Sequence, residues 1–192
     1  MTQTTDKPAL MKWGLEQYHK AVKAGVFEGC RVELLRGDIV EMSPIEPLHD
    51  DIQEELAVYL RSMLGDRARV REAKAITLPD NSEPIPDISV VKPQRYRDRH
   101  PHVEDVYLLI EIANSRPIRD TKVKRLIYAE AGIPEYWVFD LKQDELRIFR
   151  DVAVTINGSD YQTDIICQND PLSIQAFPDV VLSATAMMRL IE

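Results

Sequence analysis

The spacing of apolar and polar residues divides the first third of the chain into a helix, a hairpin and a second helix. Residues 11–25 have the pattern of a short amphipathic helix that Gly25 closes. Residues 31–42, RVELLRGDIVEM, predict two strands that turn at Arg36-Gly37-Asp38. A helix with one buried face is predicted from Pro47 onward. Its apolar side chains fall at helical spacing, at Leu48, Ile52, Leu56, Tyr59, Leu60 and Met63.

The middle of the chain has the pattern of extended structure. Residues 68–78 predict a strand, and residues 79–84, PDNSEP, predict a break rich in turn formers. Residues 87–91 and 106–113 are almost continuously apolar, which is typical of central strands covered on both faces.

The second half begins with a helix and continues mainly as strands. A helix is expected from about Asp120, with Val123, Leu126, Ile127 and Ala131 on one side and Gly132 at its end. Residues 135–141, 145–150 and 164–168 predict strands, and residues 184–191 a short helix. The order strand, helix, strand requires a crossover connection, so we expect an α/β fold with some parallel pairing.

Length and composition are those of one globular domain. The 192 residues, 44% of them hydrophobic, fit a single domain over residues 1–192, with a flexible N-terminus over residues 1–10. The sequence contains neither an apolar run long enough to span a bilayer nor a recognisable secretory signal. Cys30 and Cys167 are too few for a disulfide framework or a zinc site. We therefore expect a cytoplasmic protein without a membrane partner.

The charge is unevenly distributed along the chain. The formal net charge is −8, which argues against nucleic acid as a partner. However, residues 92–102 carry a local charge of +3 and residues 116–125 a local charge of +4, so the remainder carries −15. These two segments bracket the strand at 106–113. They are interpreted either as solvated loops and a helix face, or as contacts to a nucleic-acid backbone.

A carboxylate interrupts the most apolar strand. Glu111 lies within residues 108–115, LLIEIANS, and burying it without a partner would cost several kcal/mol, roughly. Asp87 opens another apolar strand directly after Pro86. If these strands are neighbours, the two carboxylates can converge and hold Mg²⁺ or Mn²⁺. The alternative, of about equal weight on spacing alone, is that Asp87 caps a turn and Glu111 pairs with an arginine.

The helix that follows Glu111 offers a lysine on either edge of its apolar face. Lys124 lies at one edge, with Tyr128 one turn further along, and Lys122 lies at the other. Spacing does not choose between the two lysines, and a solvated helix lysine is the ordinary interpretation of either one.

The segments PDISVV, YLLIEIANS and RDTKVKRLIYAEAGIPEYWVFDL together resemble the Uma2 family of proposed endonucleases. The hairpin residues 33–38, the Pro-Leu-His at 47–49 and above all residues 131–140 carry the resemblance, which covers most of the chain. The family looks like a branch of the PD-(D/E)xK nuclease superfamily. The resemblance therefore implies a restriction-endonuclease-like α/β fold, a central mixed sheet flanked by helices, with an N-terminal helix and β-hairpin.

The resemblance also implies roles for individual residues. Asp87 and Glu111 match the two metal-binding acids. The superfamily lysine would fall at Ala113 and is missing there, and the resemblance implies Lys124, ahead of Tyr128, as its replacement. Two further residues, Glu33 and His49, occupy positions that match family motifs. Glu33 is expected to add a metal or water ligand, whereas His49 is interpreted first as a polar residue in the first turn of its helix.

Together these features predict Mg²⁺- or Mn²⁺-dependent hydrolysis of phosphodiester bonds, with DNA as the expected substrate and a homodimer as the expected assembly for cutting two strands. Tyr96 is expected to stack on a base. Backbone contacts are expected from Arg95, Arg97, Arg99, Arg116, Arg119 and Lys122. The rival hypotheses are a nuclease fold that binds without turnover, which the missing strand lysine and the acidic net charge favour, and a structural protein whose acids pair with Arg116 or Arg119.

Overall fold

The computed structural model describes residues 10–44, 46–113, 117–156, 158–167 and 171–191, without the side chains of residues 117–121. The N-terminus expected to be flexible lies outside these residues except for Leu10, which is exposed. None of the described helices is long and apolar enough to cross a membrane.

A six-stranded mixed sheet forms the centre of the molecule. Its strands lie in chain order: β3 (Arg69–Glu72), β4 (Ile88–Val91), β5 (Val106–Ala113), β6 (Glu135–Asp140), β7 (Glu145–Thr155) and β8 (Gly158–Cys167). The β5–β6 pair is parallel and the other four pairs are antiparallel. Helix α3 (Pro117–Ala131) makes the crossover between β5 and β6. The predicted α/β fold with a central mixed sheet is confirmed.

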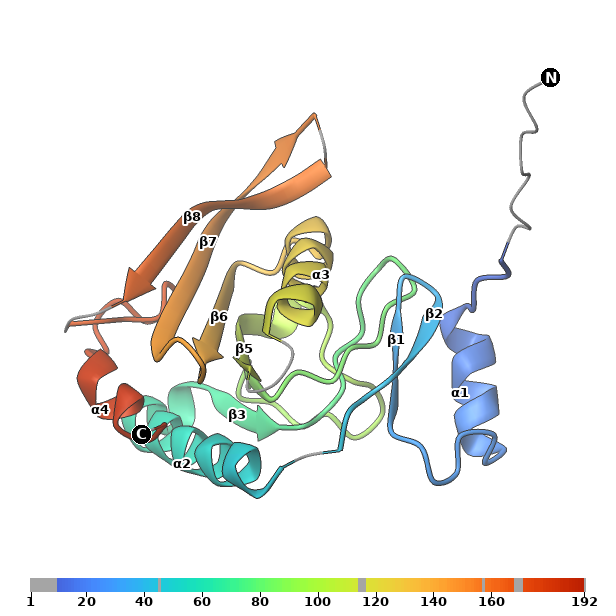
Figure 1. Ribbon diagram of the computed structural model, residues 1–192, viewed down its shortest axis with the longest axis horizontal. Coiled ribbons are helices and arrows are strands. Elements are labelled where there is room, and N and C mark those ends of the chain that lie inside the picture. The colour runs from blue at the N-terminus through green and yellow to red at the C-terminus, as the bar shows by residue number, and fades with distance from the viewer. Residues whose placement is uncertain (1–9, 45, 114–116, 157, 168–170, 192) are drawn as a thin grey trace.

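Helices cover both faces of this sheet (Figure 1). On one face, α2 (Pro47–Leu64) and α4 (Ala184–Met188) cover a core that contains Leu56, Leu60 and Trp137. On the other face, α3 packs Ile127 and Tyr128 against strand residues such as Leu109. Burial on both faces explains why β5 and β6 are almost continuously apolar.

The N-terminal elements form a smaller unit at one end of the molecule (Figure 1). Helix α1 (Leu15–Lys23) lies beside the hairpin of β1 (Val32–Leu35) and β2 (Asp38–Glu41). Gly37 in the hairpin turn has a φ of +77°, and a Cβ there would lie 2.9 Å from the Cβ of Lys12. Glycine is therefore required for this close approach. The hairpin joins the main body where the N–H of Glu83 donates to the carbonyl of Leu34 at 2.7 Å.

Two segments differ from the sequence expectation. The strand predicted over residues 68–78 ends at Glu72, because Ala73 has a left-handed φ of +43° and turns the chain. The strand predicted at 145–150 and the described part of the one predicted at 164–168 are the inner ends of the longer β7–β8 hairpin, whose outer half curves over α3 (Figure 1). Short 3₁₀ turns at Gly65–Arg67 and Val103–Asp105 complete the described elements.

A buried ion pair ties the C-terminal segment to the sheet. Glu135 is fully buried and accepts a hydrogen bond from Arg150 Nε at 2.7 Å and one from the Trp137 indole at 2.8 Å. Its second oxygen accepts from the N–H of Gln175 at 2.7 Å, and Arg150 also donates to the carbonyl of Ser173. The C-terminal chain is thus held to β6 and β7 by one carboxylate.

Replacing Arg150 will test this connection. Arg150→Ala leaves Glu135 buried without its cation, so we expect a loss of about 3–5 kcal/mol in the free energy of unfolding. Arg147→Ala, on the same strand, removes a more exposed pair with Asp164 and should cost about 1 kcal/mol or less. Urea denaturation of both variants measures the difference, and equal losses would contradict this role for Glu135.

Candidate active site

The register between β4 and β5 brings the two predicted acids together. Ile88 is paired with Ile110 in this antiparallel ladder, so Asp87, one residue earlier, falls opposite Glu111, one residue later. Oδ2 of Asp87 accepts a hydrogen bond from the N–H of Ile112 at 2.7 Å, which fixes the carboxylate against β5. Asp87 is partly exposed and Glu111 is buried.

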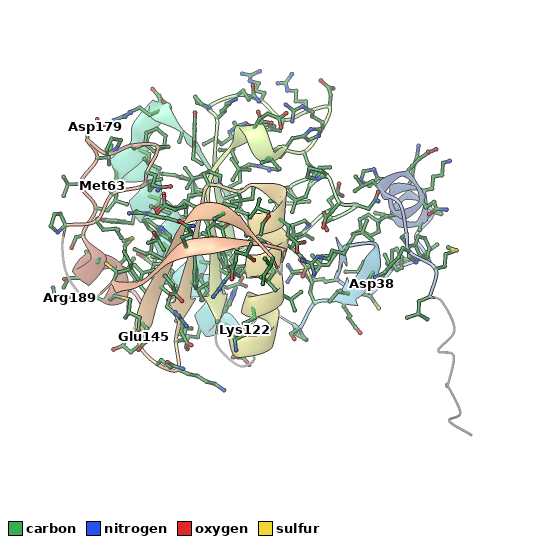
Figure 2. The ribbon with its side chains drawn as sticks, turned by 90° about the horizontal axis from the view of Figure 1, so that it is seen from above. Asp38, Met63, Lys122, Glu145, Asp179 and Arg189 are labelled. Atoms are coloured by element: carbon green, nitrogen blue, oxygen red, sulfur yellow. The ribbon has the colours of Figure 1, made fainter. Side chains whose placement is uncertain are left out.

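The lysine next to Glu111 comes from α3. Nζ of Lys124 lies 3.0 Å from Oε1 of Glu111, and the hydroxyl of Tyr128 donates to the same oxygen at 2.8 Å. Lys124 and Tyr128 are one helical turn apart and therefore lie on the same side of the helix. Lys122 is exposed and lies near the beginning of α3 (Figure 2). Spacing alone left the choice between Lys122 and Lys124 open. The contact with Glu111 selects Lys124.

Glu33 reaches the same lysine from the N-terminal hairpin. Its Oε2 lies 3.2 Å from Nζ of Lys124 and accepts the N–H of Ile85 at 3.0 Å. Glu33, Lys124 and Glu111 are 4%, 7% and 8% exposed, so the lysine bridges two buried carboxylates. The N-terminal hairpin therefore contributes directly to the site.

His49 also belongs to this cluster. Its Nε2 lies 3.2 Å from Oδ2 of Asp87, and its Nδ1 is buried without a hydrogen-bond partner among the described residues. The hydrogen bond to Asp87 raises the pKa of His49, against an opposing effect of burial. The first interpretation of His49, an ordinary polar residue of the first helical turn, does not account for this contact.

The site holds more negative than positive charge. Burial raises the pKa of Glu111 to about 8, and Asp87 and Glu33 add to the shift against the opposing effect of Lys124. Burial alone would lower the pKa of Lys124, but the carboxylates of Glu111, Glu33 and Asp87 together raise it. The lysine therefore keeps its proton, and a further cation would lower the cost of ionising Glu111.

The chain beside Asp87 makes a turn at Ala73 that the sequence pattern did not reveal. The N–H of Ala73 donates to the carbonyl of Asp87 at 2.9 Å, and the next residue, Lys74, is exposed. Because residues 68–78 have the pattern of one continuous strand, the left-handed turn at Ala73 left no signal. On the α2 side lies an acidic hollow of about 460 Å³ lined by Pro47, Asp50, Asp51, Gln53, Glu54 and Glu72.

The basic segment 92–102 begins just beyond the end of β4 that is far from Asp87, about 16 Å along the strand. Arg95 and Arg97 are exposed, whereas Arg99 pairs with Asp105 at 2.6 Å. The guanidinium groups of Arg71 and Arg99 lie over the ring of Tyr96, the residue expected to stack on a base, 5.4 and 6.0 Å from its centroid.

Two of the predicted nucleic-acid contacts fall outside the part of the chain that the structure describes. Arg116 lies outside the described residues, and so does the side chain of Arg119. Among the described residues, no group of three or more His, Cys, Asp and Glu side chains is arranged to hold a metal ion.

Comparison with known proteins agrees with the fold. Residues 15–185 match the family Uma2, described as "putative restriction endonuclease". A crystal structure of a putative nuclease belonging to DUF820 from Anabaena variabilis ATCC 29413 superimposes with a TM-score of 0.71 at 16% sequence identity. The match covers 95% of this chain and 100% of that one. No curated protein sequence matches the chain.

The raised pKa of Glu111 predicts a pH-dependent stability. A carboxyl group whose pKa is higher in the folded chain stabilises the fold at low pH, and this contribution is lost as the pH rises through about 8. Without divalent cations, the free energy of unfolding should fall more steeply from pH 5 to pH 8 in the wild type than in Glu111→Gln. Denaturation in EDTA at several pH values measures both slopes. Parallel slopes would show that Glu111 is ionised throughout.

Proposed function

The chain belongs to the Uma2 family, described as "putative restriction endonuclease", and from this premise we propose that it is a Mg²⁺- or Mn²⁺-dependent endonuclease acting on DNA. The observation that carries the proposal is the contact between Lys124 and Glu111, with Asp87 on the adjacent strand. Two acids on neighbouring strands can hold a divalent cation, and a lysine beside them can stabilise the charge that develops in phosphodiester hydrolysis.

The residues present fit a hard divalent cation. Among the described residues, Asp87 makes its contacts through Oδ2 and Glu111 makes its contacts through Oε1. Oδ1 of Asp87 and Oε2 of Glu111 are therefore the candidate ligand atoms. Mg²⁺ commonly binds through one or two carboxylates and keeps several waters. Such an ion would also offset the charge that Glu111 gains when it loses its proton. When bound, it would lower the pKa of a water and draw charge from the phosphate.

The protein's own groups would prepare and stabilise the reaction. Lys124, held between Glu33 and Glu111, would orient the attacking water or offset the negative charge that develops on the phosphate. Glu33 and Tyr128 would act as positioning residues, since Glu33 binds Lys124 and Tyr128 binds Glu111. His49 would orient Asp87 through its Nε2.

The charges around the site favour one direction of approach for nucleic acid. The acidic hollow beside α2 would repel phosphates, so the backbone would enter past Lys74 and Lys122. The exposed Arg95 and Arg97 would contact phosphates further along the duplex. Arg99 is the weaker candidate because Asp105 already binds it.

Cleavage assays test the catalytic assignment. Asp87→Asn and Glu111→Gln should abolish Mg²⁺- or Mn²⁺-dependent cleavage of plasmid DNA, because they remove the proposed metal ligands. Lys124→Met should lower the rate by about 10²–10³-fold, the typical cost of losing one donor that stabilises developing negative charge. Lys23→Met, an exposed lysine on α1, is the control and should cleave normally.

Thermal unfolding of each variant shows whether it still folds. Activity that survives in Asp87→Asn or in excess EDTA would overturn the proposal. Metal binding by the wild type without cleavage of any DNA or RNA would favour the rival hypothesis of an inactive binding module.

Salt dependence tests the approach of the nucleic acid. The logarithm of the binding constant falls with log [salt], and each lost phosphate contact reduces the magnitude of this slope by about 0.9. Arg95→Ala/Arg97→Ala should therefore reduce the magnitude of the slope by about two. The control Lys20→Ala/Lys23→Ala changes the net charge equally on α1 and should leave the slope unchanged. Binding is measured by fluorescence anisotropy in Ca²⁺ with labelled duplex. An unchanged slope in the arginine variant would remove residues 92–102 from the interface.

A further inference from the structure

The outer edge of the sheet at β8 lacks the usual protection of an edge strand. In the described part of the chain, β8 has a neighbouring strand on one side only, and it is 10 residues long, against 4 residues in β3 at the opposite edge. Edge strands are commonly protected by short length, lysine or proline. β3 is short and carries two arginines, whereas β8, GSDYQTDIIC, contains no lysine, arginine or proline.

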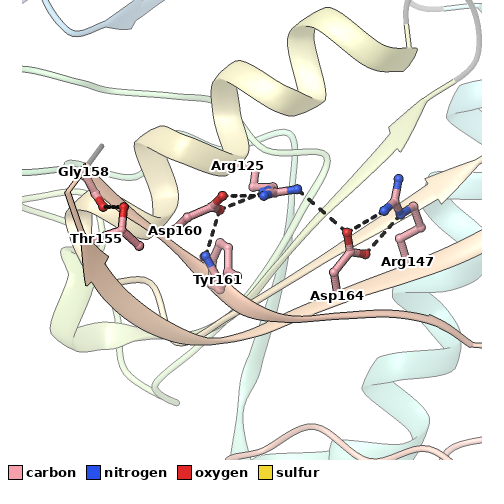
Figure 3. Close-up of polar contacts among 7 residues, drawn as sticks. All are labelled: Arg125, Arg147, Thr155, Gly158, Asp160, Tyr161 and Asp164. Carbon is pink, nitrogen blue, oxygen red and sulfur yellow. Dashed lines mark hydrogen bonds and ion pairs between the residues drawn. The ribbon is translucent and has the colours of Figure 1, made fainter.

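The acidic side chains of β8 are neutralised within the same chain (Figure 3). Arg125 donates to Oδ1 of Asp160 through its Nε at 2.8 Å, and Arg147 donates to Asp164 at 2.5 Å. Both guanidinium groups also lie over the ring of Phe149, with Cζ 5.0 and 5.5 Å from its centroid. Because its acids are already paired, this edge neither repels another acidic chain nor attracts a basic peptide.

The same edge exposes apolar side chains. Ile165 and Ile166 are 49% and 43% exposed, and Val154 and Ile156 at the end of the β7–β8 hairpin are 86% and 101% exposed. Consecutive residues of a strand point to opposite faces, so Ile165 and Ile166 leave apolar surface on both faces of the sheet. A strand added beside β8 would cover both.

We propose that β8 pairs with β8 of a second copy of this chain, antiparallel about a two-fold axis, to form one continuous sheet. An antiparallel strand is its own complement about such an axis, and a second copy supplies the same neutral edge and the same two isoleucines. The expectation of a homodimer came from the need to cut two strands, whereas the partner surface comes from the structure. Three strands separate β8 from β4, so pairing would not cover Asp87.

The mass in solution tests the pairing independently of nuclease activity. By size exclusion with light scattering over a wide concentration range, the wild type should show twice the mass of one chain. Ile165→Lys/Ile166→Lys should show a single chain, because charge on both faces opposes a paired strand. Val58→Lys/Val181→Lys, at 53% and 60% exposure elsewhere, is the matched control and should stay dimeric. A monomeric wild type, a dimeric Ile165→Lys/Ile166→Lys variant or a monomeric control would overturn the proposal.

Cysteine crosslinking tests the geometry even if the double lysine variant fails to fold. In a Cys30→Ser/Cys167→Ser background, cysteine is placed singly at Ser159, Gln162, Thr163, Ile165 and Ile166. Antiparallel pairing requires rapid disulfide formation at the position nearest the axis and a decline on both sides of it. Uniform crosslinking, or none at any position, would contradict pairing through β8.

Discussion

The ammonium group of Lys124 between the carboxylates of Glu33 and Glu111 is the contact on which the site depends. Each of the three residues is buried, and each comes from a different element: the N-terminal hairpin, the central strand and the crossover helix. A buried charge is tolerated only with partners, so these elements cannot separate without leaving a charge uncompensated. The same contact that joins the N-terminal hairpin to the sheet therefore also positions the groups proposed for catalysis.

The balance of charge explains why a divalent cation suits this arrangement. Burial and neighbouring acids raise the pKa of Glu111, while the acids keep Lys124 protonated. The site thus combines a fixed cation with a carboxyl group that would ionise readily next to a second cation. Glu111 in the most apolar strand, which is costly on its own, is explained by Lys124 and Tyr128 on α3. The arginine partner considered as an alternative is not needed to explain it.

Much of this arrangement could be predicted from the sequence, because periodicity identifies the strands and the crossover helix. The alternation of side chains placed Glu111 on one face, and the proximity of Asp87 follows if the two strands are neighbours. The choice of Lys124 required the family resemblance. The role of Glu33 could not be derived from its hairpin, since nothing local shows that the hairpin lies against Ile85. Likewise, His49 meets Asp87 only through the tertiary packing of α2, and the left-handed Ala73 interrupts what resembles a regular strand.

The central claim is that Asp87 and Glu111 hold one divalent cation beside Lys124, and the most direct measurement is a crystal structure of the protein soaked in Mn²⁺. Anomalous scattering at the manganese edge locates the ion without reference to activity. The account predicts one strong anomalous peak within bonding distance of both carboxylates, and its loss in Glu111→Gln. Strong manganese peaks only elsewhere, with Lys124 still bound to an unmetallated Glu111, would contradict it.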